Sequence, residues 1–181
     1  YITGFEKDLL KPRKNAAKEL LSVIDGLAAK LPLEIAVTHM HPDHDGMTGA
    51  FLDRKVTFWA GVGEDLNALK TQHNLDTAIY KVFTHGKKSF DLGNGRIIET
   101  FLVRGHSNGG TVYLIKKDML VFSGDALGSG FGQAFPTIEK LKQVAADSQK
   151  LVEYLKANYT PYERYGLRVY TGHSGQNAYG G

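Results

Sequence analysis

Four side chains that commonly bind metal ions lie close together in the pattern His39-x-His41-x-Asp43-His44. In an extended backbone His39 and His41 point to the same side, because side chains alternate along a strand. Pro42 then restricts the turn, so that Asp43 and His44 can approach a second point nearby. Imidazole nitrogen and carboxylate oxygen bind zinc, and they also bind iron, manganese and cobalt. The spacing therefore suits two neighbouring metal ions better than one.

An accidental cluster is the alternative to a metal site. Histidines also gather by chance, in purification tags and on solvated loops. Here the three histidines and the aspartate directly follow an apolar run, Leu33 to Thr38, and precede a predicted helix. A loop between a strand and a helix is a frequent place for functional residues. We therefore favour a functional cluster.

Three further polar residues each follow a predicted strand and have a glycine beside them. They occur in Gly105-His106-Ser107, Ser123-Gly124-Asp125 and Thr171-Gly172-His173. Glycine lets the backbone approach a neighbouring group closely. Open α/β folds place their sites where strand ends collect at one edge of a sheet. We expect His106, Asp125 and His173 to join the first motif.

The elements that must position these residues alternate between strands and helices, which predicts a layered α/β domain. Apolar residues recur at helical spacing over two long segments, 13–29 and 137–157, and shorter helices are predicted at 47–52 and 64–71. Asn94-Gly95 is a strong hairpin signal. A glycine-rich loop, 127–135, follows Asp125 and is expected to face the substrate. The predicted strands are 33–38, 55–60, 80–84, 89–92, 96–103, 111–115, 119–123 and 168–171.

Composition limits the classes of protein that fit. A chain of 181 residues has the size of one domain, so residues 1–181 are expected to form a single domain. No run of about 18 apolar residues predicts a membrane span. The net charge is only +3 and no block of Lys or Arg stands out, so no nucleic-acid partner is evident from the sequence. The absence of cysteine excludes disulfides, thiolate catalysis and zinc–thiolate sites.

Taken together, the motifs resemble the metallo-β-lactamase superfamily in order and approximate spacing, from about Leu33 to His173. The resemblance implies an α/β fold, a four-layer αββα sandwich. It implies one metal ion on His39, His41 and His106. It implies a second ion on Asp43, His44 and His173, with Asp125 bridging the two. The two divalent ions would be zinc, with iron or manganese as alternatives.

The resemblance also implies a metal-dependent hydrolase, and zinc chemistry explains why. Two ions about 3.5–4 Å apart can share a water and lower its pKa toward about 7. The bridging hydroxide would attack an ester, lactone, thioester, amide or phosphoester bond of a small-molecule substrate. Asp43 is the candidate catalytic residue, because it could orient the hydroxide or carry a proton.

Two departures from the family pattern concern the ends of the chain. Family members usually begin with two or more strands and an Asp-x-Gly turn, which we do not find between Tyr1 and Arg13. They usually continue into a closing helix, whereas this sequence stops soon after His173. We expect a fragment of a longer chain that lacks its first strands and last helix. An exposed sheet edge would then allow an oligomer. The sequence starts without Met or a signal-peptide pattern, which leaves the compartment open.

Several functions of the superfamily compete. Its β-lactamases generally lack the bridging aspartate, and one large group uses a cysteine, so Asp125 and the absence of cysteine argue against β-lactam hydrolysis. Lactonases and generic hydrolases fit without conflict. An iron-dependent redox enzyme is the second class, although flavodiiron proteins carry a glutamate where this chain has His41. A non-catalytic binding module is the third, and the complete ligand set argues against it.

Other polar residues receive ordinary roles. Asp45 is predicted to cap the helix that follows Gly46, with support of the metal ligands as the alternative. Ser107 and Asn108 are expected to satisfy their own turn or to contact substrate. His73 and His85 match no motif and are interpreted as surface or packing residues.

Overall fold

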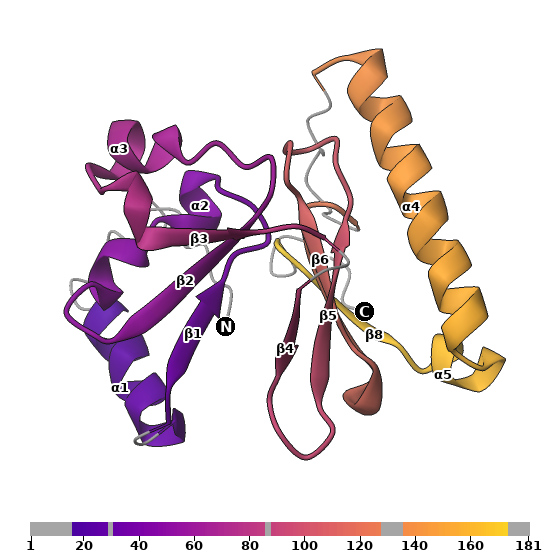
Figure 1. The fold of residues 1–181 in the computed structure, drawn as a ribbon, viewed down its shortest axis with the longest axis horizontal. Helices are drawn as coiled ribbons and strands as arrows, with labels where there is room; N and C mark the ends of the chain where they lie inside the picture. The colour runs from indigo at the N-terminus through magenta and orange to yellow at the C-terminus, as the bar shows by residue number, and fades with distance from the viewer. Residues whose placement is uncertain (1–15, 29–30, 86–87, 128–135, 174–181) are drawn as a thin grey trace.

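The computed structural model describes residues 16–28, 31–85, 88–127 and 136–173. Two β-sheets face each other, and helices cover their outer sides (Figure 1). This is the α/β fold with αββα layers that the sequence predicts. Within the described ranges, none of the helices combines the length and apolar character that a membrane crossing requires. The expectation that the first strands and the last helix are missing falls on the two ends of the chain, 1–15 and 174–181, which lie outside the described residues.

The first sheet has three parallel strands in the order β1-β2-β3. The strands are β1 (Leu33–Ala36), β2 (Val56–Gly61) and β3 (Tyr80–Phe83). Helical turns connect each strand to the next, because parallel neighbours need a crossover connection. These turns are α2 (Pro42–Asp45), η1 (Thr48–Phe51), α3 (Asn67–His73) and η2 (Thr77–Ile79). The carboxyl ends of β1 and β2 therefore lie at one edge of the sheet.

The second sheet has five strands in the order β4-β5-β6-β7-β8. They are β4 (Ser89–Asp91), β5 (Ile97–Leu102), β6 (Thr111–Ile115), β7 (Leu120–Gly124) and β8 (Arg168–Thr171). Neighbours are antiparallel up to β7, and β8 then pairs parallel to β7. The crossover between β7 and β8 contains α4 (Ile138–Asn158) and α5 (Pro161–Tyr165), and η3 (Lys116–Asp118) turns the chain between β6 and β7.

Three apolar clusters hold the layers together. On the outer side of the first sheet, Leu20, Leu21 and Ile24 of α1 (Ala16–Ala28) pack against its core. On the outer side of the second sheet, α4 contributes Leu151, which is buried. Between the sheets lies an aromatic cluster of Phe83, Phe90 and Tyr113. One face of each long helix packs against a sheet, as the periodicity predicts, but Leu27 of α1 and Ile138 and Leu141 of α4 are more than half exposed.

Most predicted elements are present, with differences at their ends. Asn94 and Gly95 adopt positive φ angles of 53° and 72°, which confirms the predicted hairpin turn. The short helix expected at 47–52 is a single 3₁₀ turn, and the helix expected from Glu64 begins at Asn67. Two short helices were not predicted, α2 and α5. The predicted start of the first helix, Arg13, lies outside the described residues.

Two hydrogen bonds attach the end of β1 to the second sheet. The hydroxyl of Tyr113 donates to the carbonyl of Val37 over 2.6 Å. The backbone N–H of Thr111 donates to the carbonyl of Thr38 over 2.8 Å. Val37 and Thr38 directly precede His39 in the sequence. The first polar motif is therefore held against the second sheet by its own backbone.

A buried carboxylate on α4 holds the segment that precedes His106. The side chain of Asp147 is only 2% exposed, and it accepts hydrogen bonds from Nε of Arg104 over 2.8 Å and from the Arg104 backbone N–H over 3.2 Å. Burial alone would raise the pKa of Asp147, but the hydrogen bonds from Arg104 outweigh it and lower this pKa. The ionised carboxylate therefore ties α4 to the end of β5.

We expect Asp147→Asn to lower the free energy of unfolding by about 1.5–3 kcal/mol near neutral pH, the usual worth of charge-assisted hydrogen bonds. Urea unfolding measures it, with Glu153→Gln on the exposed face of α4 as the control. Because the folded pKa lies below the ordinary 3.8, this stability is complete above pH 3.8 and is lost as the pH falls through the folded pKa. A difference between wild type and variant that grows in acid would contradict this.

Candidate metal centre

The structure brings the seven predicted site residues together from five segments of the chain. His39 and His41 follow β1, and Asp43 and His44 lie in α2. The other three come from the second sheet, where His106 follows β5, Asp125 follows β7 and His173 follows β8. Within each of three overlapping sets, the possible ligand atoms lie within 4.8 Å of one another. These sets are His39-His41-His106, His39-His44-Asp125 and Asp43-His44-His173.

The first set consists of three histidines. Nε2 of His106 lies 3.0 Å from Nδ1 of His41. The ring of His39 lies 4.5 Å from that of His41 and 4.8 Å from that of His106, between centroids. His39 is only 2% exposed, and its Nε2 has no hydrogen-bond partner in the described part of the chain. A buried nitrogen without a partner is costly, which favours a ligand at this point.

The Asp43-His44-His173 set combines two histidines with one carboxylate. Nε2 of His44 and Nε2 of His173 are 3.4 Å apart. Oδ2 of Asp43 lies 3.4 Å from the His44 nitrogen and 3.3 Å from the His173 nitrogen. This is the grouping that the family resemblance implies for the second ion.

Asp125 lies between the His39-His41-His106 set and the Asp43-His44-His173 set. Its Oδ2 is 3.4 Å from Nε2 of His106 and 3.1 Å from Nε2 of His173. Its Oδ1 is 3.4 Å from Nε2 of His44. Asp125 therefore contacts histidines of both sets, as a bridging ligand would have to do. The bridging role itself stays a prediction.

The electrostatics of the cluster favour the protonation states that bind metal. Burial, together with the neighbouring His44 and His41, lowers the pKa of His39 to about 2. Burial also lowers the pKa of His106. For Asp125, burial alone would raise the pKa, but the hydrogen bond and charge of His44 bring it far below its usual range. Near neutral pH, His39 and His106 are neutral and Asp125 is ionised, as metal coordination requires.

The distances also fit a metal ion. Zinc lies about 2.0–2.1 Å from imidazole nitrogen in tetrahedral sites, which places two such nitrogens about 3.3 Å apart. The paired nitrogens of the cluster are separated by 3.0 and 3.4 Å. The donor set suits zinc, iron or manganese. That these seven residues bind metal, and how many ions they bind, stay predictions.

Gly172 allows the last histidine to reach the cluster. A Cβ atom at this position would lie 2.1 Å from Oδ1 of Asp125 and 2.6 Å from Cε1 of His44. Both distances are below 3.0 Å, so any residue with a Cβ would force one of these two side chains to shift. The backbone N–H of Gly172 also donates to the carbonyl of Gly124 over 2.9 Å. This contact confirms the expected close approach of the glycines beside Asp125 and His173.

The predicted capping role of Asp45 is wrong. Its side chain is buried, and its Oδ1 lies 2.8 Å from Nε2 of His73. The residue before η1 is Met47, which forms no side-chain cap. His73 is therefore not an ordinary surface residue, because it pairs with a carboxylate beside His44. The two partners are 28 residues apart and belong to no common motif, so no sequence signal linked them.

Glu64 belongs to no motif and was not predicted from the sequence, yet its carboxylate accepts hydrogen bonds from Met40, Ser107 and Gly109. Ser107 therefore bonds to Glu64 instead of only satisfying its own turn. Asn108 accepts a hydrogen bond from Nζ of Lys140 at the start of α4. The predicted substrate-facing loop, 127–135, lies outside the described residues except for Leu127.

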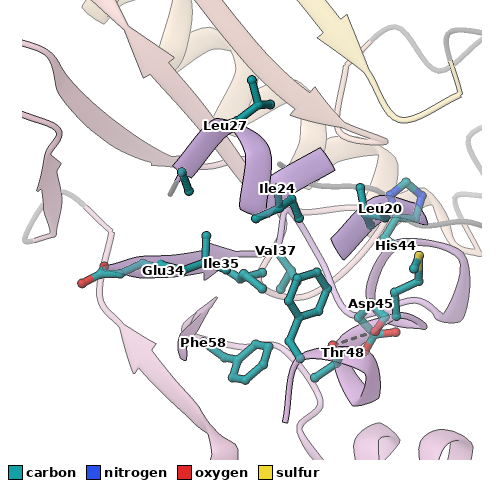
Figure 2. Close-up of a pocket in the computed structure, with 14 residues that line it drawn as sticks. Leu20, Ile24, Leu27, Glu34, Ile35, Val37, His44, Asp45, Thr48 and Phe58 are labelled. Carbon is teal, nitrogen blue, oxygen red and sulfur yellow. Dashed lines mark hydrogen bonds between the residues drawn. The ribbon is translucent and has the colours of Figure 1, made fainter. Parts of the chain in front are cut away.

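A cavity of about 190 Å³ lies between α1 and β1, beside the cluster (Figure 2). Its lining is mainly apolar and includes Leu20 and Ile24 of α1 and Phe58 of β2. His44 and Asp45 line it as well. The His44 side chain therefore borders both the polar cluster and an apolar cavity.

The family model described as the metallo-beta-lactamase superfamily matches residues 14–161. No curated protein sequence matches the chain.

Solved structures give the same result at the level of the fold. The chain is similar to metallo-beta-lactamase IND-7, with a TM-score of 0.63 and 18% identity over 95% of this chain and 71% of that one. It is similar to a metallo-beta-lactamase from Pontibacter korlensis, with a TM-score of 0.60 and 21% identity over 84% and 67% of the two chains. The DIM-1 metallo-beta-lactamase gives a TM-score of 0.60 and 19% identity over 86% and 67%.

We expect Gly172→Ala to disrupt the cluster, because the added Cβ must displace Asp125 or His44. The free energy of unfolding should fall by about 1–3 kcal/mol, as for other overpacked sites, and bound metal should decrease. Gly26→Ala is the matched control, since nothing lies within 4 Å of a Cβ there and the residue is inside α1. Urea unfolding and elemental analysis of both variants measure these effects. Full metal content in Gly172→Ala would argue against the arrangement.

Proposed function

Since the chain belongs to the metallo-beta-lactamase superfamily, we propose that it is a metal-dependent hydrolase, with zinc as its metal. One observation carries this proposal. Histidines from both sheets surround the carboxylate of Asp125, with nitrogen–oxygen distances of 3.1 to 3.4 Å. The cluster is partly buried, and its imidazole nitrogens and carboxylate oxygens meet in a small volume. Such a set of donor atoms suits a cation better than any other ligand.

In the proposed assignment, one ion would be held by His39, His41 and His106. The other ion would be held by Asp43, His44 and His173. Asp125 would contact both. When bound, two such ions lower the pKa of a shared water toward about 7 and polarise the bond to be cleaved.

Asp43 differs from Asp125 in its access to solvent. The side chain of Asp43 is 29% exposed, whereas that of Asp125 is 7% exposed. We propose that the Asp43 carboxylate, in addition to holding metal, orients the attacking water, accepts a proton from it and passes that proton to the leaving group. The greater exposure supports this role, because a proton carrier must reach either the substrate or bulk water.

The proposed substrate is a small molecule with an ester, lactone, thioester, amide or phosphoester bond. The similar solved structures are named as metallo-beta-lactamases. At 18–21% identity these likenesses support the fold, and fold does not determine substrate. The carboxylate of Asp125 and the absence of cysteine lead us to place lactones and esters ahead of β-lactams.

Metal analysis tests the proposed function most directly. Protein purified without added metal should contain about two ions per chain, most of them zinc. A chelator should abolish hydrolysis of a lactone or ester panel, and added zinc should restore it. Iron with oxygen-dependent activity would favour the redox alternative. One ion per chain would favour a mononuclear mechanism, and no uptake even after reconstitution would refute the metal site.

Replacement of Asp43 by Asn tests its proton role. We expect kcat to fall by about 10²- to 10⁴-fold, the usual contribution of a general acid or base. Metal content must be measured on the same sample, because Asp43 is also a proposed ligand. Asp53→Asn, at an exposed position in the connection between η1 and β2, is the control. Unchanged turnover at full metal content would exclude the proton role.

A further inference from the structure

We propose that Glu64, which lies outside the seven-residue cluster, is a positioning residue that holds His39, His41 and His106 in the geometry that binds one metal ion. The inference rests on the proposed metal-dependent function. It concerns one of the two ions only, which makes it separately testable.

The carboxylate of Glu64 connects two segments that are distant in the sequence. Glu64 is located between β2 and α3. Its Oε2 accepts a hydrogen bond from the backbone N–H of Met40 over 2.8 Å. Its Oε1 accepts two more, from the hydroxyl of Ser107 over 2.7 Å and from the backbone N–H of Gly109 over 2.9 Å. One side chain therefore joins three parts of the chain.

The partners of Glu64 lie directly beside the three histidines. Met40 separates His39 from His41, and Ser107 follows His106. The bond to the Met40 N–H fixes the peptide plane between His39 and Met40, from which the His39 side chain projects, and His41 is the next residue along the chain. The bonds to Ser107 and Gly109 fix the other loop relative to the same carboxylate. Mutation of groups that orient metal ligands typically weakens metal affinity by about 10- to 100-fold.

Glycines let the two loops pack backbone against backbone around Glu64. A Cβ at Gly109 would lie 2.6 Å from the Glu64 nitrogen and 2.8 Å from its Cγ. Gly63 adopts a φ of +100°, and a Cβ there would lie 2.6 Å from the carbonyl oxygen of Asn108. The two loops are thus in direct contact, and the carboxylate has a defined place between them.

All three partners of Glu64 donate hydrogen bonds, so the side chain at this position must offer acceptors only, as an ionised carboxylate does. Two carboxylate oxygens can accept from every partner at once. A glutamine at the same position would present an amide N–H either to Met40 or to the pair formed by Ser107 and Gly109. One of the two loops would lose its attachment although the side chain has nearly the same size. Replacement of Glu64 by Gln is therefore a sharp test of the hydrogen-bond pattern.

Cobalt(II) titration of the metal-free protein, followed by visible absorption, separates the two ions. Wild type should take up two equivalents. Glu64→Gln should bind one equivalent as wild type does, and the other about 10- to 100-fold more weakly. The weakened ion should be the one with the three-histidine spectrum. Glu153→Gln, which neutralises an exposed carboxylate on α4, should titrate like wild type.

Ser107→Ala provides a milder second variant. It removes one donor and leaves the carboxylate and both backbone bonds, so it should weaken the same ion by a smaller factor. If Glu64→Gln does not fold, as judged by circular dichroism, Ser107→Ala decides the question.

The outcomes distinguish this inference from the proposed function. No cobalt uptake by wild type would refute the proposed function. Uptake of two equivalents with equal affinities in wild type and both variants would leave the function intact and overturn the role of Glu64. Equal weakening of both ions in a folded variant would also overturn it, because in the described residues the Glu64 carboxylate bonds to Met40, Ser107 and Gly109, none of which belongs to the Asp43-His44-His173 set.

Discussion

The convergence of histidines on the Asp125 carboxylate is the constraint on which the rest of the structure depends. A buried carboxylate is costly unless opposite charge or hydrogen bonds compensate it. Asp125 meets this requirement through Nε2 atoms of three histidines at 3.1 to 3.4 Å. Those histidines come from both sheets, so the sheets must pack in one register for the carboxylate to be tolerated. Gly172 belongs to the same constraint, because any larger residue would separate the groups.

The layers supply the rigidity that such a convergence needs. The aromatic cluster between the sheets contains Phe83, Phe90 and Tyr113. Tyr113 also donates a hydrogen bond to Val37, just before the first motif. Apolar packing and a directional polar contact thus act on the same point. The site is therefore a product of how the sheets pack, and the loop with the first motif is only one part of it.

The seven site residues could be gathered from the sequence because each follows a recognisable strand or belongs to a dense motif. The hairpin at Asn94-Gly95 was predictable for a similar reason, since the turn requires positive φ at adjacent positions. Glu64 and the Asp45–His73 pair were not predictable. Their partners lie 24 to 45 residues away, and nothing local marks such contacts. Helix α5 did carry a signal, the capping box of Thr160 and Glu163.

The separation of the site residues along the chain has a consequence for folding. His41 meets His106 across 65 residues, and His44 meets His173 across 129. Contacts across such long loops form late in folding, because the chain loses conformational entropy on closing the loop before the distant contacts can compensate for it. A ligand that binds only the finished cluster stabilises the native state by mass action, by about 2.7 kcal/mol at one hundred times its dissociation constant. The availability of the ion would thus set the fraction of chains that is folded, as well as whether they can react.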